Sequence, residues 1–205
     1  MKNEIMTGDK KNEKLVFEKY FPGYTFDYEA ENLKGEFTHF DLNTIHNLAS
    51  VTKSITSIIF GIAVDQGFFK NIEEKIFTFF PQNASLNDSL KSQMTLLHLL
   101  TMTSGLQWNE NDVSYSEREN DIIQLFIVPD PVHFILSKPV IYQPGSTFNY
   151  NGGVWNSKQI VSSQWITESI RPYVRFNSKA GYGYQWWIKD YELGNSSIHS
   201  IAAMG

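Results

Sequence analysis

Residues 48–63 have the sequence LASVTKSITSIIFGIA, which sets a serine and a lysine three positions apart at the start of an apolar segment. Apolar residues recur at helical spacing after Ser50, and Gly67 suits the left-handed conformation that ends many helices. The pattern therefore predicts a buried helix that begins at about Ser50 and ends near Asp65. Residues at i and i+3 share a helix face, so the Lys53 amine is expected to reach the Ser50 hydroxyl.

A serine and a lysine in this arrangement can form a nucleophile. A partly desolvated Lys53 would lose its proton readily enough to act as a base, and the positive end of the helix dipole favours negative charge developing at Ser50. The alternative is structural, namely a serine that caps the helix and a lysine that extends its amine to water. This is the only Ser-x-x-Lys in the chain, but the spacing alone does not separate the two interpretations.

Two later segments extend the pattern. Residues 95–106, TLLHLLTMTSGL, predict a short helix with a threonine cap and a glycine stop, in which His98 is expected to be structural rather than a catalytic base. Asp130 followed by Pro131 predicts another helix. It leads to residues 143–150, QPGSTFNY, in which a Pro-Gly turn precedes Tyr150.

In this order, the Ser-x-x-Lys helix, the leucine-rich segment and the Pro-Gly turn before Tyr150 resemble the class C β-lactamase-like branch of the penicillin-recognising serine hydrolases, which includes esterases and D-amino-acid peptidases. The resemblance implies that Ser50, Lys53 and Tyr150 are catalytic, with Tyr150 facing the nucleophile and helping to move its proton. The alternative for Tyr150 is a core aromatic after a turn. Residue 152 is Gly where the family's Tyr-x-Asn motif has Asn, so the amide that would polarise the site is absent from that position.

The same resemblance implies an α+β fold of the β-lactamase/transpeptidase type, with an antiparallel sheet flanked by helices and a helical subdomain. We expect a single domain over residues 1–205, in which residues 1–42 and 154–205 form an α/β part and residues 43–153 a helical part. The fold is expected to be incomplete. After residue 153 the chain resembles a part of the family that normally comes several dozen residues later, and it ends before the strand that carries the third motif and one oxyanion donor.

Local patterns add expectations outside the central motifs. Residues 1–12 are polar and are expected to be disordered. A helix is predicted from a cap at Ser162 to a point before Pro172, and it should pack Trp165, Ile166 and Ile170 against the sheet. Strands are predicted where apolar and aromatic residues alternate or cluster, at residues 14–21, 181–188 and 197–204.

Composition narrows the function classes. The 205 residues are 41% hydrophobic, which is typical of a globular protein, and the net charge of −5 without a Lys/Arg cluster argues against nucleic acid or an anionic membrane as a partner. The chain has no cysteine, so disulfides and thiol catalysis are excluded. The five histidines lack metal-ligand spacing, and no metal or other cofactor is expected. No signal peptide or membrane-spanning segment is predicted, so the chain as written is expected in the cytoplasm, although relatives are often exported.

The first functional hypothesis is a serine hydrolase that acts through an acyl-enzyme on an ester, amide or β-lactam carbonyl of a small molecule or peptide. The second is a truncated, catalytically inactive remnant of the same family. A third is a protein that binds acyl-peptides without turnover. Apolar faces left uncovered by the missing segments predict self-association of the chain.

Overall fold

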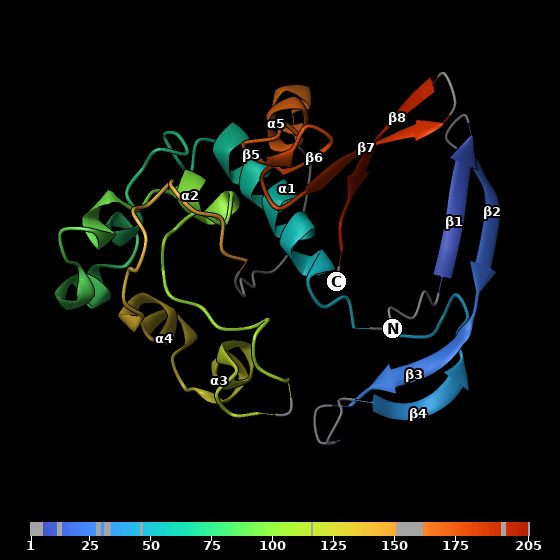
Figure 1. Ribbon diagram of the computed structural model, residues 1–205, viewed down its shortest axis with the longest axis horizontal. Helices are drawn as coiled ribbons and strands as arrows, with labels where there is room; N and C mark the ends of the chain where they lie inside the picture. The colour runs from blue at the N-terminus through green and yellow to red at the C-terminus, as the bar shows by residue number, and fades with distance from the viewer. Residues whose placement is uncertain are drawn as a thin grey trace. The chain divides into compact units, whose positions relative to one another are not determined.

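A computed structural model describes residues 6–11, 14–27, 30, 34–45, 47–115, 117–150, 162–193 and 196–204. The chain divides into two compact units, Met1–Leu48 and Ala49–Gly205. Helices and antiparallel strands both occur, so the expected α+β class is confirmed (Figure 1). The expected grouping of residues 1–42 with residues 154–205 stays a prediction, and the junction after residue 153 lies outside the described residues.

The first unit contains two antiparallel hairpins. Strand β1 (Met6–Lys11) pairs with β2 (Lys14–Tyr20), and β3 (Pro22–Phe26) pairs with β4 (Lys34–His39). The strand predicted at residues 14–21 is therefore confirmed. The disorder expected for residues 1–12 is wrong where β1 forms, because strand pairing is made by backbone groups and does not require apolar side chains.

Helix α1 (Val51–Asp65) is the longest helix of the second unit and confirms the first prediction. It ends as expected, with Gly67 in the left-handed region at φ +76°. The buried face differs from the isoleucine stripe suggested by the periodicity: of the isoleucines only Ile62 is buried, and the other buried positions are Lys53, Ser54, Ser57 and Gly61. Small residues are needed there because other segments approach the helix closely.

One such approach is made by Trp165, whose Nε1 donates to the Ser57 carbonyl at 3.1 Å. Trp165 belongs to α5 (Ser163–Ser169), which begins after the predicted cap: Ser162 Oγ accepts from the Trp165 amide at 3.1 Å. The expectation that this helix packs Ile166 against the sheet is wrong, since Ile166 is 52% exposed. Trp165 instead packs on α1 and lies 5.3 Å from the ring of Tyr184.

Substitution of Gly61 tests this helix contact. A Cβ at residue 61 would lie 2.3 Å from the Trp165 indole, so we expect Gly61→Ala to lower the free energy of unfolding by about 1–3 kcal/mol through overpacking. Urea unfolding measures the change. Gly67→Asn is the control, because the space around Gly67 is open and asparagine tolerates a positive φ. Equal stability of Gly61→Ala and the wild type would contradict the close helix contact.

The second unit also contains a four-stranded antiparallel sheet in the order β5 (Val174–Asn177), β6 (Ala180–Tyr182), β7 (Trp187–Leu193) and β8 (Ser196–Ala202). The strand predicted at the C-terminal end is confirmed by β8. The single strand predicted over residues 181–188 is wrong, because a turn divides it. In that turn the Gly183 amide donates to the Trp186 carbonyl at 2.9 Å, and Gln185 has φ +67°.

Short helices between α1 and the sheet enclose a core made of Ile76, Met94, Leu96, Leu106 and Leu136. Both predicted caps are present, since Thr95 accepts from the His98 amide and Asp130 accepts from the His133 amide. The leucine-rich helix ends at Leu100 rather than at the glycine expected to stop it. The elements are η1 (Ile76–Thr78), η2 (Pro81–Leu86), η3 (Lys91–Gln93), α2 (Leu96–Leu100), α3 (Asp121–Ile127) and α4 (Pro131–Ser137).

Candidate functional site

Ser50 lies at the N-terminus of α1, directly after a residue with an unusual backbone conformation. Ala49 has φ +42°, a region that side chains with a Cβ rarely adopt, and Ser50 follows with helical angles. Such positions cost free energy and cluster at functional sites. A helix does not need a positive φ at the residue before its N-terminus, so the conformation of Ala49 marks the start of α1 as a candidate functional site.

The Ser50 and Lys53 side chains are in direct contact. Lys53 Nζ donates a hydrogen bond to Ser50 Oγ at 2.8 Å, and the lysine residue is only 5% exposed. Within the described part of the chain, Ser50 Oγ caps no backbone amide of α1. Neither half of the structural alternative holds, because the serine does not cap the helix and the lysine does not extend into water.

Tyr150 belongs to a segment that is distant in the sequence, and its ring lies beside Lys53. Its neighbour Asn149 is held by two hydrogen bonds, from its amide to the Met102 carbonyl at 2.8 Å and from Nδ2 to the Leu106 carbonyl at 3.2 Å. The Tyr150 ring lies under Lys53, with Nζ 4.5 Å from the ring centroid. An interaction with the Ser50 side chain acts to lower the pKa of its hydroxyl, against the larger effect of burial. The structure thus brings together all three residues that the sequence singled out.

Aromatic residues of the sheet support the Tyr150 ring. The ring centroid lies 5.8 Å from that of Trp187 at the start of β7. Phe148, two residues earlier, contacts the rings of Phe176, Tyr182 and Trp187. The sheet thereby fixes the orientation of the segment that carries Tyr150.

The pKa values of the two titratable partners of Ser50 move in opposite directions. Burial lowers the pKa of the Lys53 amine below its ordinary value, while the Glu110 carboxylate opposes that change. Burial raises the pKa of the Tyr150 hydroxyl, its interaction with Ser50 acts against this, and Glu110 raises the pKa further. These directions favour Lys53 as the group that loses its proton first, with Tyr150 remaining neutral.

Glu110 is the residue that sequence reasoning missed. It is 5% exposed, and both carboxylate oxygens accept hydrogen bonds, Oε2 from Trp108 Nε1 at 2.9 Å and Oε1 from the Tyr115 hydroxyl at 3.0 Å. Burial, followed by the Glu110 charge and hydrogen bond and by Tyr150, raises the pKa of Tyr115 to about 12. A single carboxylate in an irregular segment has no periodicity or spacing by which it could be found.

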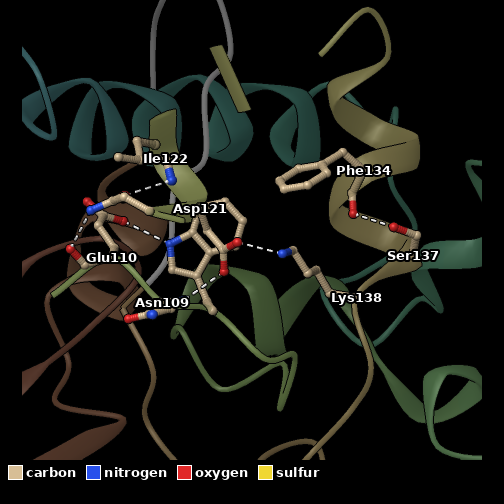
Figure 2. A network of polar contacts seen from close by, with 9 residues as sticks. Asn109, Glu110, Asp121, Ile122, Phe134, Ser137 and Lys138 are labelled. Carbon is tan, nitrogen blue, oxygen red and sulfur yellow. Dashed lines mark hydrogen bonds and ion pairs between the residues drawn. The ribbon is translucent and has the colours of Figure 1, made fainter. Parts of the chain in front are cut away.

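The loop around Glu110 is held by a polar network (Figure 2). Asn120 Nδ2 donates to the Glu110 carbonyl at 3.0 Å, so the loop is closed across ten residues. Asp121 accepts from the Asn109 amide at 2.7 Å and forms an ion pair with Lys138 at 2.5 Å. The backbone on both sides of Glu110 therefore has defined partners.

His98 takes no part in this site. Its Nδ1 accepts from the Thr95 amide at 3.2 Å in a capping box, and burial lowers the pKa of its imidazole. This is the structural role expected for it. No group of metal-ligating side chains occurs in the part of the chain that the structure describes. None of its helices is long and apolar enough to cross a membrane.

Comparisons with known proteins identify the family of the chain. The sequence profile of the family described as Beta-lactamase matches residues 8–157, more than half of the chain. A proposed β-lactamase from Bacteroides dorei has 21% identity and a TM-score of 0.42, with 69% of this chain and 34% of that one covered. A proposed 6-aminohexanoate-dimer hydrolase from Bacillus anthracis has 19% identity and a TM-score of 0.44, with 71% and 35% covered. The chain spans about a third of the length of these two structures. None of the curated proteins compared with the chain matches it.

Proposed function

Because the chain belongs to the β-lactamase family, we propose that Ser50 is the nucleophile of a serine hydrolase that acts through an acyl-enzyme on an ester, amide or β-lactam carbonyl. One observation carries the proposal: a buried lysine donates a hydrogen bond to the serine hydroxyl at 2.8 Å. A lysine of this kind has lost most of its hydration, and its neutral form is therefore easier to reach than that of an exposed lysine.

In the first half of the reaction Ser50 Oγ attacks the carbonyl carbon while neutral Lys53 takes the hydroxyl proton. The oxyanion that forms lies near the N-terminus of α1, where the Ser50 amide and the helix dipole stabilise negative charge. When the intermediate collapses, the bond to the leaving group breaks. The leaving oxygen or nitrogen receives the proton from Lys53 through the Tyr150 hydroxyl, and Ser50 stays acylated.

In the second half a water molecule attacks the acyl-enzyme carbonyl. Lys53 accepts the water proton through the Tyr150 hydroxyl, the bond between Ser50 Oγ and the acyl carbon breaks, and Oγ takes the proton back from Lys53. The products are a carboxylic acid and the free serine. The reaction needs no oxidant, reductant or cofactor.

The pH dependence of acylation follows from the Lys53 assignment. The reactive form of Lys53 is neutral, so the rate should rise with pH through the depressed pKa of Lys53 and level off above it, while Tyr150 remains protonated because its pKa is raised. The rate of adduct formation with a fluorophosphonate, followed by intact mass over a pH series, measures this dependence. A rate that begins to rise only near the ordinary lysine value of 10.5 would contradict the role of Lys53.

Turnover is tested separately with two chromogenic substrates, p-nitrophenyl acetate and a chromogenic cephalosporin. We expect release of at least one chromophore by the wild type and none above background by Ser50→Ala, since the substitution removes only the attacking oxygen. The substrate that is turned over identifies the carbonyl class. Equal release by both proteins would show that Ser50 is not the nucleophile.

Self-association and the cellular location expected from the sequence stay predictions. Exposed apolar side chains in the second unit support self-association, for example Phe68, Ile127 and Ile166. Sedimentation equilibrium of the purified chain tests it, and a concentration-independent monomer mass would contradict it.

A further inference from the structure

Gln185 lies in the turn between β6 and β7 and is hydrogen-bonded to two helices of the second unit. Its backbone amide donates to the Leu100 carbonyl at 3.0 Å. Its side-chain Nε2 donates to the Leu99 and Leu100 carbonyls, at 2.9 and 2.7 Å, at the end of α2. Its own carbonyl accepts from Ser54 Oγ of α1 at 2.6 Å. A glutamine that is only 7% exposed thus joins α1, α2 and the sheet.

Gln185 also has a backbone conformation that glutamine rarely adopts. Its φ is +67°, in the region where a glycine would be free of strain. In the described part of the chain, only Ala49 and Met102 share a positive φ among the residues that are not glycine. Ala49 precedes Ser50, and the Met102 carbonyl accepts from the amide of the residue before Tyr150. Strained residues cluster at functional sites, and the other two therefore point to a link between Gln185 and this site.

The segments that Gln185 joins carry or support two of the proposed catalytic residues. Ser54 follows Lys53 on α1, so the hydrogen bond to the Gln185 carbonyl lies one residue from the base. In the other direction Trp187 comes two residues after Gln185, and its ring centroid lies 5.8 Å from that of Tyr150. Lys53 Nζ lies 4.5 Å from the centroid of the same tyrosine ring. The contacts therefore run from Gln185 through α1 to Tyr150 and return through Trp187.

We propose that Gln185 is a positioning residue of the Ser50 site, which holds the sheet against α1 so that the Tyr150 ring stays beside the Lys53 amine. The inference rests on the proposed function, because it concerns the geometry of the proton relay in that reaction. Gln185 acts through Trp187 and the start of α1 rather than on the acyl group. Loss of its hydrogen bonds should therefore displace the Tyr150 hydroxyl from the path of the proton.

Dependence on the leaving group is the expected signature of this role. Tyr150 passes the proton to the leaving group, and a good leaving group needs less protonation. A displaced Tyr150 should therefore slow acylation by an alkyl ester more than acylation by a p-nitrophenyl ester. A variant that is only partly folded lowers both rates by the same factor, because the fraction of folded chains enters both equally. The ratio of the two rates thus separates positioning from stability.

The test is single-turnover acetylation of the full chain by p-nitrophenyl acetate and by trifluoroethyl acetate, an alkyl ester with the same acyl group, followed by intact mass. Gln185→Met removes both side-chain hydrogen bonds and keeps a side chain of similar length. We expect acetylation to slow about tenfold with the alkyl ester and about twofold with the p-nitrophenyl ester. Trp165→Phe is the matched control, because it removes another buried hydrogen bond to α1, the one to the Ser57 carbonyl. Its two rates should change by the same factor.

Ser54→Ala tests the same link from the side of α1. The substitution removes the hydroxyl that donates to the Gln185 carbonyl, and alanine favours the helix, so α1 should persist. The alkyl ester should again show the larger loss. In a Tyr150→Phe background neither Ser54→Ala nor Gln185→Met should change the ratio of the two rates further, because the hydroxyl through which Gln185 acts is already absent. A further change of the ratio in that background would overturn the proposed role.

The outcomes separate this inference from the proposed function. Acetylation of wild-type Ser50 with an unchanged ratio in Gln185→Met would overturn the role of Gln185 and leave the proposed function standing. A wild type that is acetylated by neither ester would overturn both. If circular dichroism shows that Gln185→Met is unfolded, Ser54→Ala decides, and an unchanged ratio in that variant would overturn the role of Gln185.

Discussion

Replacing Lys53 by methionine is expected to slow adduct formation at Ser50 by about 10²–10⁴-fold, the usual contribution of a positioned general base. Methionine has a similar length and leaves no unpaired charge in a position that is 5% exposed. The loss should appear at every pH, because the variant has no amine to deprotonate. The rate constant for fluorophosphonate labelling, measured by intact mass, reports the effect directly.

Lys91 offers a matched control for the Lys53 variant. It is also 5% exposed, but its Nζ donates to the Leu136 carbonyl at 2.7 Å rather than to a hydroxyl at the site. Lys91→Met should lower thermal stability and leave the labelling rate of the folded protein unchanged. Similar labelling rates for Lys53→Met and the wild type would contradict the assignment of Lys53 as the base.

Tyr150→Phe is expected to have the second-largest effect, a loss of about 10²-fold in acylation by an ester. The variant keeps the ring under the Lys53 amine and against Trp187. It removes only the hydroxyl, which interacts with Ser50 and which we propose passes the proton to the leaving group. Because a good leaving group needs less protonation, the loss should be larger for an alkyl ester than for a p-nitrophenyl ester. Single-turnover acylation by the two esters measures the difference.

Tyr184→Phe serves as the control for Tyr150→Phe. The Tyr184 hydroxyl donates to the Tyr173 hydroxyl, so its removal changes a partly buried hydrogen bond that does not involve Ser50. This control should lose stability without a dependence on the leaving group. An equal loss for both esters in Tyr150→Phe would show that the hydroxyl supports the fold and does not relay the proton.

Features set by neighbouring residues were predictable from the sequence. Apolar periodicity and a terminal glycine predicted α1, and the i to i+3 geometry of a helix predicted the Ser50–Lys53 contact. The caps at Thr95, Asp130 and Ser162 follow the same local chemistry. The place of Tyr150 was inferred from the order of motifs that the chain shares with a known family, since no local rule joins residues one hundred positions apart.

Features that depend on tertiary contacts were not predictable in this way. The buried face of α1 is defined by the approach of Trp165 at Gly61 and by the hydrogen bond from Ser54 Oγ to the Gln185 carbonyl, neither of which appears in a hydrophobic pattern. The turn at Gln185 interrupts an aromatic run that reads as one strand. The hydrogen bonds that Glu110 accepts from Trp108 and Tyr115 form only in the folded chain. The same is true of its effect on the pKa of Lys53.

Intact-mass spectrometry after incubation with a fluorophosphonate tests most directly whether Ser50 is an activated nucleophile. We expect one adduct per wild-type chain, located by peptide mapping in the segment that contains Ser50, and none on Ser50→Ala. A parallel incubation with a penicillin asks whether a β-lactam carbonyl is accepted. A folded wild-type chain without an adduct, or an adduct that persists in Ser50→Ala, would show that Ser50 is not an activated nucleophile.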